Sequence, residues 1–102
     1  MTTLHTVNKS PFEKNSLASC LRLAEPGSAL LLIEDGVYGA QRGTRHSGAV
    51  ECAAKTLSLY VLGPDVRARG LDPDGLIEGV SIVDYDGFVD LASTHARVHA
   101  WL

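Results

Sequence analysis

The most constraining feature of the sequence is an uninterrupted run of five apolar residues, 29–33, with turn-forming residues on both sides. The run is far shorter than the ~20 apolar residues that a membrane-spanning helix needs. Apolar residues without polar alternation over this length are typical of a strand that is buried on both faces. Strands of this kind occur in parallel sheets that helices cover on both sides. The run therefore predicts an α/β fold without a membrane-spanning helix.

Strands and helices are predicted to alternate along the rest of the chain. Besides 29–33, strands are expected over residues 4–7, 57–62 and 80–83, and the apolar residues 98–102 should pack down or form a short fifth strand. A first helix is expected from Pro11, with Ser10 as its cap, to the proline at position 26. The pattern predicts an open, mostly parallel sheet of four to five strands with helices on both faces, similar to flavodoxin.

The remaining helices are expected to be short. Asp35 is a candidate cap for a helix over residues 37–42, residues 49–54 form a helical turn or two, and Pro64 begins another short helix. Asp84 is the expected cap of a last helix over residues 85–95, whose predicted apolar side consists of Phe88, Val89, Leu91 and Ala92.

Length and charge narrow the class of protein. The 102 residues leave room for one domain, residues 1–102, and the 45% of hydrophobic residues makes a disordered chain implausible. The formal net charge of −3 argues against nucleic acid as a direct partner, because phosphate binding needs a basic surface. No signal peptide or membrane span is evident, so we expect a cytoplasmic protein.

Two cysteines, Cys20 and Cys52, are candidates for thiol chemistry. Their spacing matches neither a CxxC redox pair nor a zinc site, and in a reducing compartment we expect free thiols. Cys20 lies on the apolar side of the first predicted helix, where a small apolar core residue competes with a reactive thiol as its interpretation. Cys52 lies among alanines and is interpreted as a packing residue.

Other patterns give weaker signals. Glycines between residues 36 and 43 follow a strand, as in ligand-binding α/β domains, but they match no phosphate-binding fingerprint. His95 and His99 have a spacing that suits a metal on a helix, but no third ligand is evident. His5 is interpreted as a hydrogen-bonded core histidine. We therefore expect no cofactor and no metal, and keep a small ligand-binding flavodoxin-like domain as an alternative.

Several segments, in order along the chain, resemble the DsrH/TusB family of sulfur-relay proteins. The similar segments are LHTVNKSP at residues 4–11, LLLIEDGV at 30–37, LYVL at 59–62 with Asp65, RARGL at 67–71, Asp84-Tyr85 with Phe88-Val89, and the terminal Trp101-Leu102. Each match is short, and together they span nearly the whole chain. The resemblance implies a DsrE-like α/β fold.

The resemblance also implies a function and a set of partners. Family members are small subunits of a heterohexamer with DsrE/TusD-like and DsrF/TusC-like subunits, and DsrC/TusE-like and TusA-like proteins carry the sulfur. Such complexes pass persulfide sulfur either to the 2-thiouridine of the tRNA wobble position or in the cytoplasmic oxidation of sulfur compounds. Cys20 fits the DsrH side, so we expect the sulfur-oxidation branch, with tRNA thiolation as the alternative.

The resemblance leaves the role of Cys20 open. The main sulfur-carrying cysteine is generally assigned to the DsrE/TusD subunit, so this chain is expected to be a non-catalytic or auxiliary subunit of a sulfurtransferase. Cys20 is the candidate persulfide carrier of this chain, against the interpretation as core packing. The short predicted helices after the second and third strands would leave part of the sheet apolar, which also favours assembly with a partner.

Overall fold

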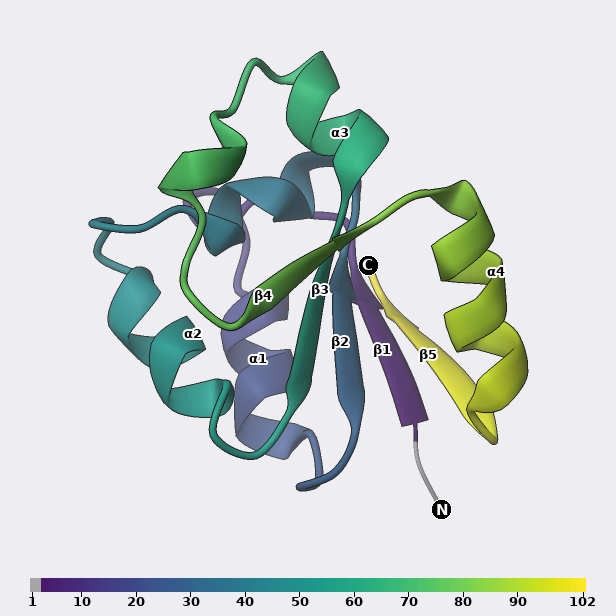
Figure 1. The fold of residues 1–102 in the computed structure, drawn as a ribbon. Coiled ribbons are helices and arrows are strands. Elements are labelled where there is room, and N and C mark those ends of the chain that lie inside the picture. The colour runs from purple at the N-terminus through teal and green to yellow at the C-terminus, as the bar shows by residue number, and fades with distance from the viewer. Residues whose placement is uncertain (1–2) are drawn as a thin grey trace.

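A five-stranded sheet organises the molecule, which the computed structural model describes over residues 3–102. The strands are β1 (Thr3–Val7), β2 (Ala29–Leu32), β3 (Ser58–Leu62), β4 (Val80–Val83) and β5 (Arg97–Trp101). All four pairings are parallel, in the order β4-β3-β2-β1-β5 (Figure 1). The predicted open parallel sheet is confirmed, and the apolar end of the chain forms the fifth strand.

Helices cover the two faces of this sheet unequally. The helices are α1 (Ser16–Leu23), α2 (Ser47–Ala53), α3 (Gly63–Ala68) and α4 (Tyr85–Thr94), with short 3-10 segments η1 (Glu34–Ala40) and η2 (Pro73–Gly75). In Figure 1 α1 and α2 lie behind the sheet, whereas α4 alone lies on the near side, over the end of the sheet that contains β1 and β5. Within the described residues, no helix is long and apolar enough to cross a membrane.

The core reflects this asymmetry. The larger cluster of buried residues lies on the face covered by α1 and α2 and takes in Val7, Leu17, Leu30 and Val61. The smaller cluster, on the side of α4, consists of the buried residues Leu4, Ala29 and Leu31 and the partly buried residues that pack on them. The second face is therefore closed by a thin apolar layer.

The first helix begins later than expected. Residues 11–13 form a turn, the Ser10 carbonyl accepts hydrogen bonds from the amides of Glu13 and Lys14, and α1 starts at Ser16. The Ser10 hydroxyl accepts the amide of Phe12 at 3.2 Å, two residues on. The serine stabilises a local turn rather than the helix, which is the usual competition between side-chain and helical hydrogen bonds.

Two further expectations need correction. Asp35 does not cap a helix: the 3-10 segment η1 already begins at Glu34, and the Asp35 carboxylate accepts a hydrogen bond from Arg69, which follows α3. Val89 is 64% exposed, while Phe88, Leu91 and Ala92 pack on the smaller core cluster. The packed residues have helical spacings of three and four, and Val89 lies about 100° around the helix from Phe88. By contrast, Asp84 caps α4 as predicted, accepting the amide of Gly87 at 2.8 Å.

Candidate functional site

Cys20 lies in the middle of α1 and is sealed inside the larger core cluster. Its side chain has 0% exposure and packs among aliphatic residues. This desolvation raises the pKa of the thiol to about 12, because burial penalises the charged thiolate. In this arrangement Cys20 is a protonated thiol without contact to water.

Cys52 is the exposed cysteine, which corrects its interpretation as a packing residue. It lies on α2, at a mostly apolar groove of about 490 Å³ between α1 and α2. Arg22 and Lys55 also line this groove. Both cysteines are free thiols, one inside and one on the surface.

The glycine-containing segment after β2 is packed against the rest of the fold and does not form an open phosphate-binding loop. A Cβ atom at Gly36 would lie 2.1 Å from the carbonyl oxygen of Val7, and one at Gly39 would lie 2.7 Å from Leu17. Val37 and Ala40 are fully buried. The glycines allow η1 to approach β1 and α1 closely, so a ligand-binding role of this segment gains no support.

Hydrogen bonds and an ion pair join η1 to α3 and to Arg69, beyond the carboxyl ends of β2 and β3. Glu34 adopts a left-handed backbone conformation, with φ of 49°, and its amide donates to Oδ2 of Asp65 at 2.6 Å. Arg69 donates to Oδ1 of Asp35 at 2.9 Å and lies 3.8 Å from Asp65. The segments that follow β2 and β3 are thus held together by hydrogen bonds between residues that lie 31 and 34 positions apart in the sequence.

An aromatic cluster that the sequence analysis missed lies between β1 and β5. His5 pairs with His99 in the parallel register, and Trp101 is next on the same face of β5. The Trp101 indole Nε1 donates to Nδ1 of His5 at 3.0 Å, and the ring of His99 stacks on that of Trp101 with centroids 4.4 Å apart. The prediction of a hydrogen-bonded, buried His5 is confirmed. The sequence signal for this cluster is the two-residue spacing of His99 and Trp101, which places both side chains on one face of a strand. It becomes informative once residues 97–101 are known to form a strand beside β1.

The electrostatics of His5 follow from this position. Burial, and secondarily the neighbouring His99, lower the pKa of His5 from its ordinary value of 6.5. Because the indole can only donate, Nδ1 of His5 is the acceptor, and the proton of the neutral ring resides on Nε2. His5 therefore presents a hydrogen-bond donor on the side away from Trp101.

The spacing of His95 and His99, which would suit a metal only on a helix, does not bring the two side chains together on one helix. His95 follows the last residue of α4 and lies 2.7 Å from the carbonyl oxygen of Leu91, whereas His99 is on β5. Within residues 3–102 no group of three or more metal-ligating side chains is present. The two histidines are separated by the turn from helix to strand, so the helical spacing does not apply.

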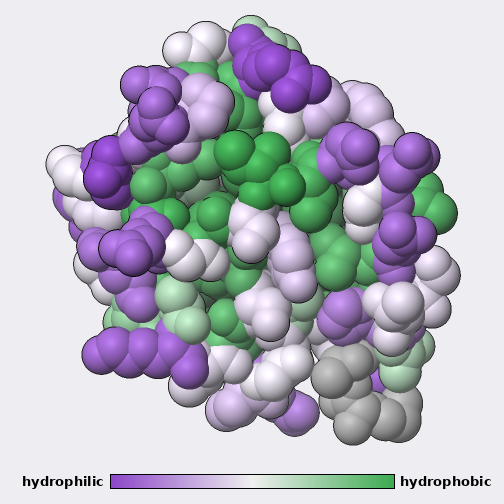
Figure 2. Space-filling view, viewed as in Figure 1, coloured by the Kyte–Doolittle hydropathy of each residue, from purple (hydrophilic) through white to green (hydrophobic). Residues whose placement is uncertain are grey.

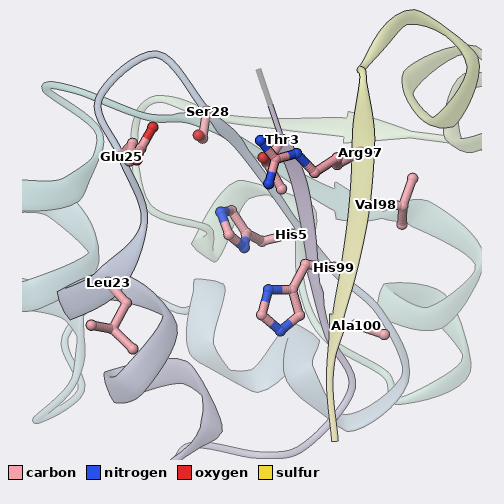
Figure 3. Close-up of a pocket in the computed structure, with 9 residues that line it drawn as sticks. All are labelled: Thr3, His5, Leu23, Glu25, Ser28, Arg97, Val98, His99 and Ala100. Carbon is pink, nitrogen blue, oxygen red and sulfur yellow. The ribbon is translucent and has the colours of Figure 1, made fainter. Parts of the chain in front are cut away.

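A pocket of about 540 Å³ lies beside this cluster, at the amino ends of β1 and β5. It is lined by Thr3, His5, Leu23, Glu25, Ser28, Arg97, Val98, His99 and Ala100. Figure 3 shows His5 in the middle of the lining, with Glu25, Arg97 and His99 around it. The pocket brings together residues from the two ends of the chain and from the loop after α1.

The side of the sheet that carries α4 exposes apolar residues. Figure 2 shows a hydrophobic region in the middle of this face, between hydrophilic margins. Tyr85 and Val89 of α4 and Val98 of β5 are each more than half exposed. Tyr60 of β3 and Val83 of β4 are only partly covered, although they pack on the smaller core cluster. The expected partly apolar sheet face is present.

Comparison with known proteins connects this fold to a family. The family model described as DsrH like protein matches residues 9–98. Curated relatives named Protein TusB include one from Pectobacterium parmentieri, 37% identical over 96% of this chain and 99% of its own length. Others come from Klebsiella pneumoniae strain 342, at 40%, and Escherichia coli K12, at 36%, with the same coverage of both chains.

Solved structures agree on the architecture. The ychN protein of Escherichia coli superimposes with a TM-score of 0.83 over 98% of this chain and 99% of its own, at 22% identity. MTH1491 from Methanobacterium thermoautotrophicum gives 0.73 over 96% of each chain, also at 22% identity. These likenesses show a shared fold, while the match of the family model and the identity to the TusB proteins show descent: the chain belongs to the DsrH/TusB family.

Proposed function

We propose that this chain is a TusB-type subunit of a sulfur-relay complex. The observation that carries the proposal is the relationship to proteins named TusB, at 36% to 40% identity over 96% of the chain. In this role the chain supplies a binding surface to the complex and is auxiliary to the sulfur-carrying subunit. A cytoplasmic location belongs to the same proposal.

The partners in this proposal are DsrE/TusD-like and DsrF/TusC-like subunits. The single helix over one face of the sheet and the exposed apolar residues of that side support an assembled state, since exposed apolar area of this kind marks interaction surfaces. The test is co-expression with the TusC-like and TusD-like proteins encoded in the same genome, followed by native mass spectrometry. We expect a complex that contains all three chains, and a chain that elutes alone contradicts the proposal.

The relatives favour tRNA thiolation over sulfur oxidation as the pathway of this chain. The presence of Cys20 favoured sulfur oxidation, but the curated relatives cited above all carry the TusB name. We therefore propose tRNA wobble thiolation as the pathway. An Escherichia coli strain without its TusB, TusC and TusD proteins, given this chain with its own two partners, is expected to regain 2-thiouridine in its tRNA. If the complex assembles and no 2-thiouridine returns, the tRNA branch is refuted.

Cys20 as a persulfide carrier stays a prediction. In that role its thiolate attacks the outer sulfur of a donor persulfide, the donor leaves as a thiolate, and Cys20 becomes a persulfide. Its complete burial and raised pKa support the other interpretation, a packing residue.

The two interpretations of Cys20 are separated by sulfur transfer to matched variants. Wild type, Cys20→Ser and Cys52→Ser are incubated with a persulfidated donor and examined by mass spectrometry. A packing role predicts a gain of sulfur that is the same in wild type and Cys20→Ser. A carrier role predicts a gain that is lost in Cys20→Ser and kept in Cys52→Ser.

A further inference from the structure

We propose that the pocket at the amino ends of β1 and β5 binds a small tetrahedral oxyanion, or the oxyanion group of a larger molecule, through Arg97, His99 and His5. The proposal is independent of the sulfur-relay function. It rests on the composition of the lining and on the hydrogen bond that orients His5.

Arg97 brings a positive charge to the lining of the pocket. Within residues 3–102 the ion pairs are those of Arg69 with Asp35 and Asp65, so the guanidinium of Arg97 has no carboxylate in ion-pair contact. Figure 3 shows its side chain extending from β5 across the pocket toward β1. A guanidinium presents five donors in a fork that suits oxyanions, and it keeps its charge at all physiological pH values.

The proton of the neutral His5 ring lies on the side away from Trp101. The indole of Trp101 fixes Nδ1 of His5 as acceptor, which places the proton on Nε2, the other ring nitrogen. His99, with its ring centroid 5.6 Å from that of His5, lines the same pocket. A neutral His5 therefore offers a hydrogen-bond donor without first taking up a proton, and a bound anion favours the protonated form of His5.

Hydrogen-bond donors outnumber anionic groups in the lining. Most polar side chains of the lining can donate hydrogen bonds: Arg97, His5, His99 and the hydroxyls of Thr3 and Ser28. The carboxylate of Glu25 is the one anionic side chain of the lining. A pocket with this excess of donors complements a ligand rich in acceptors. Glu25 opposes the anion, which gives the proposal a side chain whose removal strengthens binding.

The test uses inorganic sulfate, whose charge is constant through the titration range of histidine, with adenosine monophosphate as a second arm that carries its oxyanion on a larger molecule. Binding is followed in the full-length chain by the side-chain resonances of ¹⁵N-labelled histidines, at constant ionic strength set with chloride. We expect saturable shifts of His5 and His99, a rise in the pKa of His5, and tighter binding of sulfate at about pH 6 than at about pH 8. The arm that binds tighter identifies the source of the group.

Three variants make the test specific. Arg97→Gln should weaken binding about 10-fold or more, the scale of one lost charge-assisted hydrogen bond. Glu25→Gln should tighten it, and Arg67→Gln, an exposed arginine that lines a different cavity, should leave it unchanged. All three positions are on the surface, so the fold is expected to persist. Absence of saturable shifts with both ligands, or equal weakening by Arg97→Gln and Arg67→Gln, overturns the proposal.

Discussion

The burial of Cys20 predicts a slow reaction of its thiol with an alkylating agent in the folded chain. Raising the pKa from 9.0 to about 12 lowers the thiolate population at neutral pH about 1,000-fold. A more basic thiolate is also a better nucleophile, and a Brønsted coefficient of about 0.4–0.5 raises the rate constant of each thiolate roughly 15- to 30-fold. Ionisation alone therefore slows Cys20 by about 30- to 60-fold relative to an ordinary thiol. Its 0% exposure adds a steric barrier, so reaction requires an opening of α1.

The assay is a time course with iodoacetamide at neutral pH, with the alkylated peptides quantified by mass spectrometry. The matched reference is Cys20 itself in guanidinium chloride, where burial no longer acts. Cys52, exposed on α2, reports in the same sample that the reagent is active. We expect Cys52 to react while Cys20 stays thiol. Alkylation of Cys20 in the folded chain within about tenfold of its rate in the unfolded chain refutes the reasoning, because the ionisation effect alone exceeds that factor.

Three other substitutions, with Gly48→Ala as a control for one of them, test the core, the close backbone approach and the buried histidine. Leu17→Asp puts an unpaired carboxylate into the larger core cluster and should cost about 3 kcal/mol or more, seen as a loss of the native melting transition. Gly36→Ala places a Cβ 2.1 Å from the carbonyl of Val7 and should cost about 1–3 kcal/mol, whereas Gly48→Ala, with open space on α2, should stabilise by up to about 1 kcal/mol in denaturant titrations. Because the pKa of His5 is lower in the fold than its ordinary 6.5, stability should fall as pH drops through 6.5, and His5→Gln should reduce that slope in melting temperature; an unchanged slope contradicts the assignment.

Much of the fold follows from patterns that are local in the sequence. Residues 29–33, 57–62 and 80–83 carry continuous or β-forming apolar character, and each becomes a strand of the parallel sheet within one residue of its expected limits. Asp84 accepts the amide of Gly87, three residues on, and caps α4 as predicted. These features depend on residues that are close together in the sequence, so they can be predicted from the sequence alone.

The errors arise where two local interactions compete or where contacts are distant. Ser10 has both a helix cap and a tight turn within reach, and the turn prevails. The burial of Cys20 and the exposure of Cys52 depend on how α1 and α2 pack, which the apolar character of their neighbours does not decide. The pocket around His5 forms because β1 pairs with β5, and the spacing of residues within either segment does not show that pairing.

The position of β1 in the sheet has a consequence for the kinetics of folding. β1 stands between β2 and β5, and its contact with β5 joins residues as distant as His5 and Trp101, 96 positions apart. β1 and β2 are joined by a loop about two doublings shorter, so pairing β5 costs roughly 1 kcal/mol more in loop entropy. We expect the order of folding to follow this cost, with β1, β2 and β3 forming the nucleus and β5 docking after the barrier. Trp101→Phe, which removes the bond to His5, should then accelerate unfolding and leave the refolding rate unchanged in stopped-flow measurements.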